Sequence, residues 1–215
     1  MYSKISRALE TAEIYLTQEK IAGLTLYLEE LLRWNRRINL TAIQDADTAI
    51  EKHIIDSLLI LKYAGDRECL LDVGSGAGLP GVPLALVEQK LRVLSVDSSG
   101  KKINFQRHIK RQLQLHNFEP INRRIEQLQL AKQASCDLIV SRAFSSIETF
   151  VACSWSFQQE GGLWVAMKGP EGEKEVARLK DSALSKKLKD IKLISYNLPL
   201  SKVQRTVVLA TKKMP

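Results

Sequence analysis

The chain has 215 residues, of which 45% are hydrophobic and 26% charged, and its net charge is +8. It is long enough to bury a good core as one large domain, or as one domain plus a small appendage, and no window approaches the roughly 18 consecutive apolar residues that a membrane helix needs. Residues 1–66 hold eight Lys/Arg against ten Asp/Glu while residues 67–215 hold 24 against 14, so the basic field of the second part favours a polyanionic partner.

Two amphipathic helices are predicted in residues 1–66. From an N-cap at Thr17, apolar residues recur at three- and four-residue spacing and predict a helix over 19–34. A capping-box pattern at 48–51 begins the second helix, which Gly65 ends. We expect these residues to form a small helical cap. The first residues of the chain include acids and show no cleavage-site pattern, so we expect no secretory signal. We therefore expect a cytoplasmic protein without a membrane partner.

Residues 67–215 show short apolar runs that alternate with helix-length segments. The clearest predicted strands are 70–73, 91–96, 137–141 and 163–167. This alternation is typical of a parallel α/β sheet. The last two runs, 191–200 and 206–213, are separated by a few residues only, so they can form only an antiparallel hairpin at one sheet edge.

The stretch LLDVGSGAGLPG, residues 70–81, joins the first predicted strand to a helix through four glycines. Glycines let the backbone approach a ligand, and the amide groups at a helix N-terminus offer positive potential. Gly76, Gly78 and Gly81 also satisfy the dinucleotide pattern G-x-G-x-x-G. A nicotinamide- or flavin-dependent oxidoreductase is therefore a competing hypothesis.

Two acids favour S-adenosylmethionine over a dinucleotide. Asp72 ends the first strand, where its carboxylate would repel a pyrophosphate and attract sulfonium and ammonium groups. Asp97 ends the second strand, 21 residues after Gly76, where it can accept hydrogen bonds from both ribose hydroxyls of an adenosine. Both kinds of cofactor use such an acid, so Asp97 locates the adenosine without naming the cofactor.

Seven segments spread over nearly the whole chain occur in a recognisable order. They are WNRRINLTAI (34–43), HIIDSL (53–58), DVGSGAGLPGVPLA (72–85), DSSGKK (97–102), RRIEQL (123–128), SRAFSS (141–146) and MKG (167–169). Together they resemble the guanine-N7 methyltransferases of small-subunit ribosomal RNA, the methyltransferase G or glucose-inhibited division protein B family. The resemblance implies a class I S-adenosylmethionine-dependent methyltransferase fold, Rossmann-like with a seven-stranded sheet. It also implies methyl transfer to N7 of a guanine in bacterial 16S ribosomal RNA.

The resemblance further implies a set of cofactor-binding positions. The positions that match those of the family are Gly74, Leu79, Ile125, Glu126 and Arg142. To these the glycine-loop argument adds Gly76, Gly78 and Asp97.

The chemistry of guanine N7 limits what the catalytic residues must do. N7 carries a lone pair and no proton, so its attack on a methyl group needs alignment and desolvation but no general base. We expect Arg142, then Lys168 and Arg124, to be the catalytic residues and to act on guanine O6 or on phosphates. Phe144 is expected either to stack on a flipped base or to be part of the core.

The expected partner is 16S ribosomal RNA or a small-subunit particle. Two groups of basic residues are candidates for the RNA contact, Lys101, Lys102, Arg107, Lys110 and Arg111 in one and Lys186, Lys187, Lys189 and Lys192 in the other. No exposed apolar heptad is evident, so we expect a monomer.

Other reactive side chains receive plainer interpretations. Cys69, Cys136 and Cys153 are odd in number and far apart, so we expect buried thiols and neither a disulfide nor a metal site. A hydrolytic triad of His53, Asp56 and Ser57 lacks a nucleophile elbow, and contacts between the cap and the cofactor domain are expected instead. Glu29 and Glu30 are expected to face solvent.

Two further function classes stay open at this point. One is an NAD-dependent oxidoreductase with a Rossmann domain, and the other is a non-catalytic basic RNA-binding module. The binding of S-adenosylmethionine or NAD would discriminate between the two enzyme hypotheses.

Overall fold

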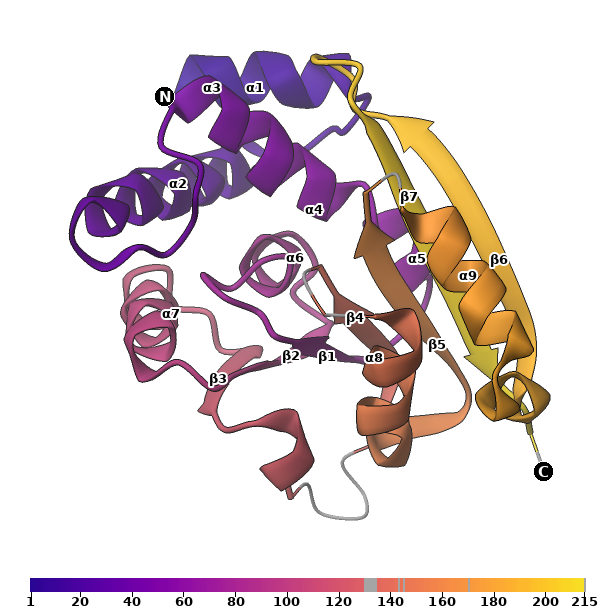
Figure 1. The fold of residues 1–215 in the computed structure, drawn as a ribbon. Helices are drawn as coiled ribbons and strands as arrows, with labels where there is room; N and C mark the ends of the chain where they lie inside the picture. The colour runs from indigo at the N-terminus through magenta and orange to yellow at the C-terminus, as the bar shows by residue number, and fades with distance from the viewer. Residues whose placement is uncertain (130–134, 143, 145, 170, 215) are drawn as a thin grey trace.

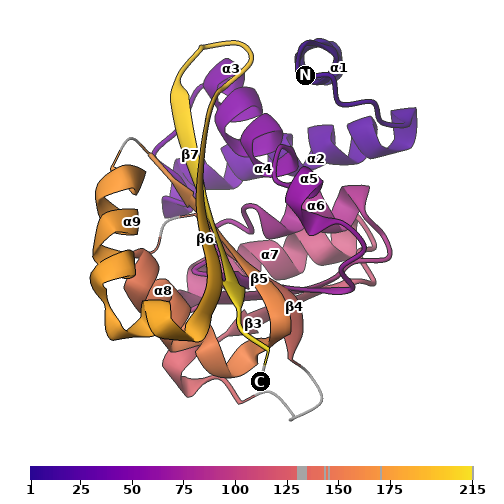
Figure 2. The same cartoon turned by 90° about the vertical axis from the view of Figure 1, so that its right-hand side faces the viewer.

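The computed structural model describes residues 1–129, 135–142, 144, 146–169 and 171–214. Its centre is a seven-stranded sheet with the order β3-β2-β1-β4-β5-β7-β6 (Figures 1 and 2). The strands are β1 (Cys69–Val73), β2 (Arg92–Asp97), β3 (Phe118–Asn122), β4 (Cys136–Ser141), β5 (Gln158–Lys168), β6 (Leu188–Asn197) and β7 (Gln204–Lys212). The first five strands pair in parallel, and β7 pairs antiparallel with both β5 and β6. This is the expected class I methyltransferase fold with its terminal hairpin.

Helices cover both faces of the sheet. They are α1 (Tyr2–Thr11), α2 (Gln18–Ile38), α3 (Ala46–Ala49), the π-helix η1 (Ile50–Ile55), α4 (Asp56–Leu58), α5 (Leu61–Ala64), α6 (Gly81–Val87), α7 (Gly100–Gln112), the 3-10 turn η2 (Ile125–Gln127), α8 (Ile147–Ser154), η3 (Trp155–Phe157), α9 (Gly172–Asp181) and η4 (Ala183–Lys187). The helix predicted over 19–34 is confirmed as α2, and the Thr17 side chain accepts from the Lys20 amide. The second predicted helix begins earlier than predicted, because Asp45 caps the Thr48 amide at 2.8 Å.

Two packed clusters of apolar side chains hold the helices on the sheet. On one face, Tyr27 and Leu28 of α2 are fully buried in the cluster that contains Leu70 of β1 and Val93 of β2. On the other face, α8 and α9 pack over alternate strand residues such as Leu71. The predicted boundary at residue 66 falls between α5 and β1, and the N-terminal helices share the first cluster with the sheet.

The β6–β7 hairpin extends past the sheet to the N-terminal helices (Figure 1). The Glu51 carboxylate accepts from the amides of Leu200 and Ser201, at 2.6 and 2.8 Å. Asp56 binds Arg205 and Tyr196, at 3.2 and 3.0 Å. The Asp56 contacts are of the kind predicted for segment 53–58, between the cap and the sheet, and Glu51 adds two contacts that were not predicted.

The expectation of three separate thiols is wrong. The structure pairs Cys69 with Cys136 in a disulfide, with their Cα atoms 4.7 Å apart. The two cysteines are 67 residues apart in sequence, but they begin β1 and β4, which are neighbouring parallel strands. Cys153 is free, and burial raises the pKa of its thiol to about 11.

The described residues contain neither a candidate metal-binding group nor a candidate membrane-spanning helix. Within them, no cluster of three or more His, Cys, Asp or Glu side chains could hold a metal ion. None of their helices combines the length and the apolar character that crossing a bilayer requires.

Candidate cofactor and substrate site

The glycine loop between β1 and α6 adopts backbone angles that would be strained for a residue with a Cβ atom. Gly74, Gly76 and Gly78 have φ angles of 70°, 59° and 87°, in the left-handed region that glycine adopts at little cost. The buried Tyr27 hydroxyl of α2 donates to the Ala77 carbonyl at 3.1 Å. The cap therefore holds this loop in place from one side.

Asp97, at the end of β2, organises the other side of the loop. Its Oδ2 accepts from the Gly76 amide and its Oδ1 from the Ser99 amide, both at 2.8 Å. The Asn122 side chain donates to its backbone carbonyl at 3.0 Å. A carboxylate has about four lone-pair sites, so each oxygen of Asp97 can still accept a hydrogen bond from a ligand hydroxyl.

A cavity of about 230 Å³ opens beside this carboxylate, and we call it the Asp97 cavity. Its lining residues are Val73, Gly74, Val96, Asp97, Ser98, Arg123, Arg124, Ile125, Glu126 and Phe144. The structure thus brings together five of the predicted site residues from three separate segments of the chain. Apolar walls, one buried acid and exposed polar groups at the rim suit a nucleoside.

Asp72 does not line this cavity, contrary to the sequence argument that placed it beside a cationic ligand. Side chains alternate along a strand, so Asp72 points to the opposite sheet face from Val73. Its Oδ2 accepts from the Gly81 amide at 2.9 Å, and its Oδ1 has no hydrogen-bond partner among the described residues. Complete burial raises its pKa to about 7. Asp72 therefore supports the start of α6 from beneath the loop.

Arg142 follows β4, and its side chain is largely but not fully buried. One nitrogen, Nη1, donates to the Lys52 carbonyl at 2.9 Å and to His53 Nδ1 at 3.2 Å. Burial lowers the pKa of Arg142. It forms no salt bridge with any residue that the structure describes. A buried cation without a paired carboxylate is costly, which favours an anionic or strongly accepting ligand beside it.

A second cavity, of about 240 Å³, lies at Arg142, and we call it the Arg142 cavity. It is lined by Ile43, Lys52, Asp56, Arg142, Met167, Lys168, Gly169 and Arg205. Lys168 Nζ binds Glu175 at 2.9 Å and the Phe144 carbonyl at 3.0 Å. Phe144 lines the Asp97 cavity, so this bond from Lys168 makes the two cavities neighbours. Both lie at the carboxyl ends of the parallel strands, where ligands of open α/β sheets bind.

Phe144 is in part a core residue, which was one of the two interpretations that the sequence offered, and its stacking on a flipped base stays a prediction. Its ring packs against Phe150 of α8, with 6.0 Å between ring centroids. A Cβ built on Gly74 would lie 3.7 Å from the Phe144 ring. The ring is thus partly core and partly wall of the Asp97 cavity. Ala143 and Ser145, on either side of it in the SRAFSS segment, lie outside the described residues.

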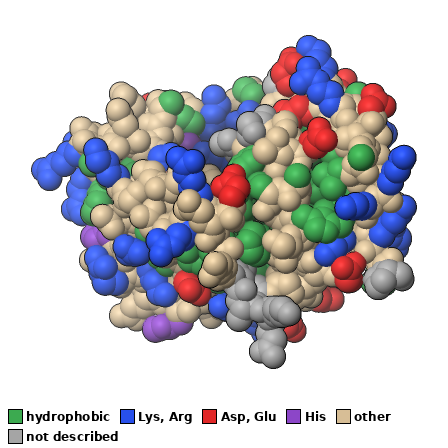
Figure 3. Space-filling model, turned by 60° about the horizontal axis from the view of Figure 1, so that its bottom comes forward, with side chains coloured by type: hydrophobic (Ala, Val, Ile, Leu, Met, Phe, Trp, Pro, Cys, Tyr) green, Lys and Arg blue, Asp and Glu red, His purple; other side chains and the backbone are tan. Residues whose placement is uncertain are grey.

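A basic surface extends from the Asp97 cavity over α7 to the end of α2. Its exposed members are Arg33, Arg36, Arg37, Lys101, Arg107, Arg111, Arg123 and Arg124. Lys and Arg side chains gather at the left of Figure 3, on the side of α7, with few acids among them. The second predicted basic group lies on η4 and β6, at the opposite sheet edge from β3.

The contact between α2 and α7 joins the two parts of this surface. The Trp34 ring lies over Phe105 and His108, with centroid distances of 5.5 and 5.1 Å. Glu30 accepts from His108 Nε2 at 2.8 Å and pairs with Arg33. Glu30 is therefore buried, and the expectation that it faces solvent is wrong because α7 packs over that face of α2.

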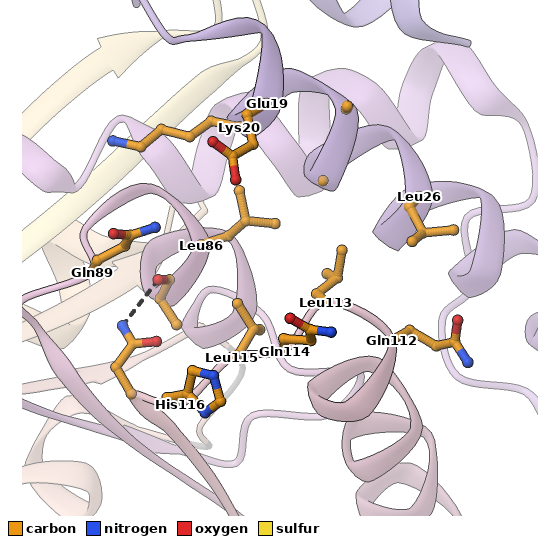
Figure 4. Close-up of a pocket in the computed structure, with 14 residues that line it drawn as sticks. Glu19, Lys20, Leu26, Leu86, Gln89, Gln112, Leu113, Gln114, Leu115 and His116 are labelled. Carbon is orange, nitrogen blue, oxygen red and sulfur yellow. Dashed lines mark hydrogen bonds between the residues drawn. The ribbon is translucent and has the colours of Figure 1, made fainter.

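A cavity larger than these two lies elsewhere. It has a volume of about 620 Å³ and is enclosed by the start of α2 and the ends of α6 and α7 (Figure 4). Asn117 donates to the Ala85 carbonyl at 3.0 Å, and Leu86 and Leu115, labelled in the close-up, line the same cavity. The cavity is at the amino ends of the strands and none of the predicted site residues line it, so size alone does not identify the site.

The predicted residues fall into three groups. Gly74, Asp97, Arg124, Ile125 and Glu126 line the Asp97 cavity, whereas Arg142 and Lys168 line the Arg142 cavity. Gly76 acts through its amide on Asp97. Gly78 and Leu79 line neither cavity: Gly78 forms the turn, and Leu79 is buried in the core. Arg124 is thus separated from the other two predicted catalytic residues.

Sequence reasoning missed several residues of the Arg142 cavity. Lys52, Asp56 and Arg205 line it, and His53 contacts Arg142 directly. The segment HIIDSL contains His53 and Asp56, for which the sequence predicted contacts between the cap and the cofactor domain but no place in a ligand cavity. No sequence signal pointed to Arg205.

Comparison with known proteins shows to which family this chain is similar. The family model described as GidB, rRNA small subunit methyltransferase G, matches residues 20–206. The ribosomal RNA small subunit methyltransferase G of Syntrophotalea carbinolica is 39% identical over 214 residues, which cover 99% of either chain. The protein of the same name from Azoarcus sp. is 45% identical over 158 residues, 74% of either chain.

Solved structures show the same fold at low sequence identity. An O-methyltransferase from Bacillus cereus in complex with SAH has a TM-score of 0.61 at 18% identity, covering 87% of this chain and 91% of that one. A SAM-dependent methyltransferase from Aquifex aeolicus has a TM-score of 0.56 at 21% identity, covering 78% and 94%. These structures show the fold, and the family match over residues 20–206 together with the relative that is 39% identical over 99% of either chain establishes that the chain belongs to the rRNA small subunit methyltransferase G family.

Proposed function

We propose that this protein transfers a methyl group from S-adenosylmethionine to N7 of a guanine in bacterial 16S ribosomal RNA. The observation that carries the proposal is the pair of adjoining cavities. The Asp97 cavity has the chemistry of a nucleoside site, and the Arg142 cavity next to it holds cations that suit a base or a phosphate. Phe144 lies at their junction.

The residues of the Asp97 cavity fit S-adenosylmethionine. Asp97 can accept from the ribose hydroxyls, Ile125 offers a buried apolar contact for the adenine, and Gly74 lets the ligand approach the backbone. Arg142 carries a buried charge that no salt bridge in the described chain compensates, and the carboxylate of a methionine moiety would do so. When bound, the cofactor supplies an electrophilic methyl group on its sulfonium.

The Arg142 cavity fits a nucleophile that needs no general base. Asp56 is the one acid among the described residues that line it, and Arg205 and Tyr196 already bind its two oxygens. Burial raises the pKa of Asp56. Because guanine N7 carries no proton, the residues here have to orient the base and exclude water. Arg142 and Lys168 can do so by donating to O6 or to a phosphate.

Ligand binding and product mapping test this function. We expect calorimetry to show tight binding of S-adenosylmethionine and of its demethylated product, and none of NAD. Mass mapping of 16S ribosomal RNA should show one guanine that lacks its N7 methyl group in cells without the protein. Selective binding of NAD would support an oxidoreductase instead. Binding of RNA without methyl transfer to free 16S RNA or to small subunits would support a non-catalytic module.

The basic surface over α7 and the end of α2 is the proposed RNA contact. Each phosphate that a cation neutralises contributes about −0.7 to the slope of log K against log salt for single strands. We expect the double variant R36A/R37A to make this slope less negative by about 1 to 2, because each residue removed is one phosphate contact.

Filter binding of a 16S RNA fragment between low and physiological salt measures this slope. The matched control is K186A/K189A, which removes two charges from the opposite sheet edge and should leave the slope unchanged. A wild-type slope near zero, or equal changes in both double variants, would refute the assignment of this surface.

Two further properties, the localisation and the oligomeric state, are part of the proposal. We propose that the protein acts in the cytoplasm, where ribosomal RNA is assembled into subunits. We also propose that it acts as a monomer, because both cavities are complete within one chain.

A further inference from the structure

His53 connects Arg142 to the chain segment that follows α2. The imidazole is 1% exposed. Its Nδ1 lies 3.2 Å from Arg142 Nη1, and its Nε2 lies 3.0 Å from Thr41 Oγ1. Both ring nitrogens are therefore within hydrogen-bond distance of one polar partner each.

The two partners determine where the ring proton lies. Arginine has donors only, so His53 Nδ1 must be the acceptor of the Arg142 hydrogen bond. The proton is then on Nε2 and is donated to Thr41 Oγ1. Burial, and after it the charge of Arg142, lowers the pKa of His53 to about 3, so the ring is neutral under physiological conditions and Nδ1 keeps its lone pair.

Asn35 fixes the position of Thr41. Its Oδ1 accepts from the amides of Leu40 and Thr41, at 2.7 and 2.9 Å. Its Nδ2 donates to the carbonyls of Thr41 and Ile43, at 2.8 and 3.3 Å. One buried amide thus satisfies four backbone groups of a segment without regular structure, and this segment presents Thr41 to the histidine.

We propose that His53, held in the Nε2-protonated form by Thr41, is a positioning residue for Arg142. This inference rests on the proposed function, in which Arg142 contacts cofactor and base. A free arginine side chain has many rotamers, and the described residues provide no salt bridge to restrain that of Arg142. His53 and the Lys52 carbonyl both bind Nη1, and the described residues give Nε and Nη2 no partner. Those nitrogens are left for a ligand in the Arg142 cavity.

Two substitutions at His53 separate positioning from packing. In His53→Asn the side-chain oxygen takes the place of Nδ1 and can still accept from Arg142, whereas the bond to Thr41 is lost. In His53→Gln the amide reaches the place of Nε2, so Thr41 keeps a partner and Arg142 loses its acceptor. Both variants remove the ring from the same buried site. We expect His53→Gln to lower kcat/KM for methylation about tenfold and His53→Asn to lower it less than threefold.

A substitution at Thr41 tests the other half of the arrangement. Thr41→Val keeps the shape and removes the hydroxyl, so His53 can adopt the other tautomer and turn an N–H toward Arg142. We expect a loss of several-fold in kcat/KM, which Thr41→Ser should largely restore. Melting temperatures of all four variants show whether the effects follow stability instead.

The tautomer itself can be observed without any assay of function. A two-bond ¹H–¹⁵N NMR spectrum of the wild-type protein should show His53 protonated on Nε2 only. A ring protonated on Nδ1, or Asn and Gln variants with equal losses of activity that track their melting temperatures, would overturn the proposal. If the wild-type protein bound no S-adenosylmethionine, the proposed function would fail, while the NMR spectrum would still decide the arrangement at His53.

Discussion

Arg142→Ala is expected to lower kcat/KM for methyl transfer about 100-fold and to change the melting temperature by only a few degrees. A charge-assisted hydrogen bond contributes about 1.5 to 3 kcal/mol when its partner is also charged, and Arg142 is placed to make such bonds to ligands in the Arg142 cavity. Its contribution to folding is small, because its bonds to Lys52 and His53 offset the cost of burying an unpaired charge.

The measurement is steady-state methylation of 16S RNA or small subunits, together with thermal unfolding of the same samples. Arg142→Lys tests the geometry, and we expect little rescue, since a lysine is a point charge and cannot donate to a protein carbonyl and a ligand through separate nitrogens. The control is Arg178→Ala, an exposed arginine on α9. Wild-type turnover in Arg142→Ala would remove this residue from the site.

Asp97→Ala is expected to weaken S-adenosylmethionine binding about 100-fold, the largest effect on cofactor affinity in the chain. Two hydrogen bonds from ribose hydroxyls to a carboxylate amount to roughly 3 kcal/mol. The substitution also removes the acceptors for the Gly76 and Ser99 amides. The glycine loop would then be less well fixed at the point where a ligand meets it.

Asp97→Asn separates these two contributions. It keeps one side-chain oxygen and the shape, so we expect a loss of about tenfold in affinity and a smaller loss of stability than in Asp97→Ala. Isothermal titration calorimetry gives the affinities, and Asp181→Asn at the exposed end of α9 is the matched control. Unchanged affinity in both Asp97 variants would contradict the placement of the ribose in this cavity.

Most of the fold could be predicted from the pattern of apolar residues, and two of the elements that were not predicted, β3 and α1, have clear reasons. β3 carries Glu119 and Pro120 and is an edge strand, where a proline is tolerated because one side of the strand needs no pairing. It therefore lacked the apolar run that marks a buried parallel strand. α1 is short and has no capping side chain at Met1, so no N-terminal signal indicated its start.

The candidate site was predicted less completely than the fold. Glycine spacing and the position of Asp97 after a strand are local features, and both are where they were expected. The sheet face to which the Asp72 side chain points depends on strand alternation relative to the loop. The prediction that Asp72 lies beside a cationic ligand was wrong for this reason. Which of the two basic groups lies near the Asp97 cavity depends on the sheet edge that each group occupies. The sequence pattern did not contain this information.

The sequence by itself determined the glycine loop, the acid after β2 and the family, because backbone conformation and strand ends depend on residues a few positions apart. Only the tertiary structure decided which distant groups meet. His53 lies 89 residues from Arg142, Asp56 lies 149 residues from Arg205, and Cys69 lies 67 residues from Cys136. Such contacts form when strand order and the packing of the cap are fixed, and these depend on the burial of apolar surface from the whole chain at once.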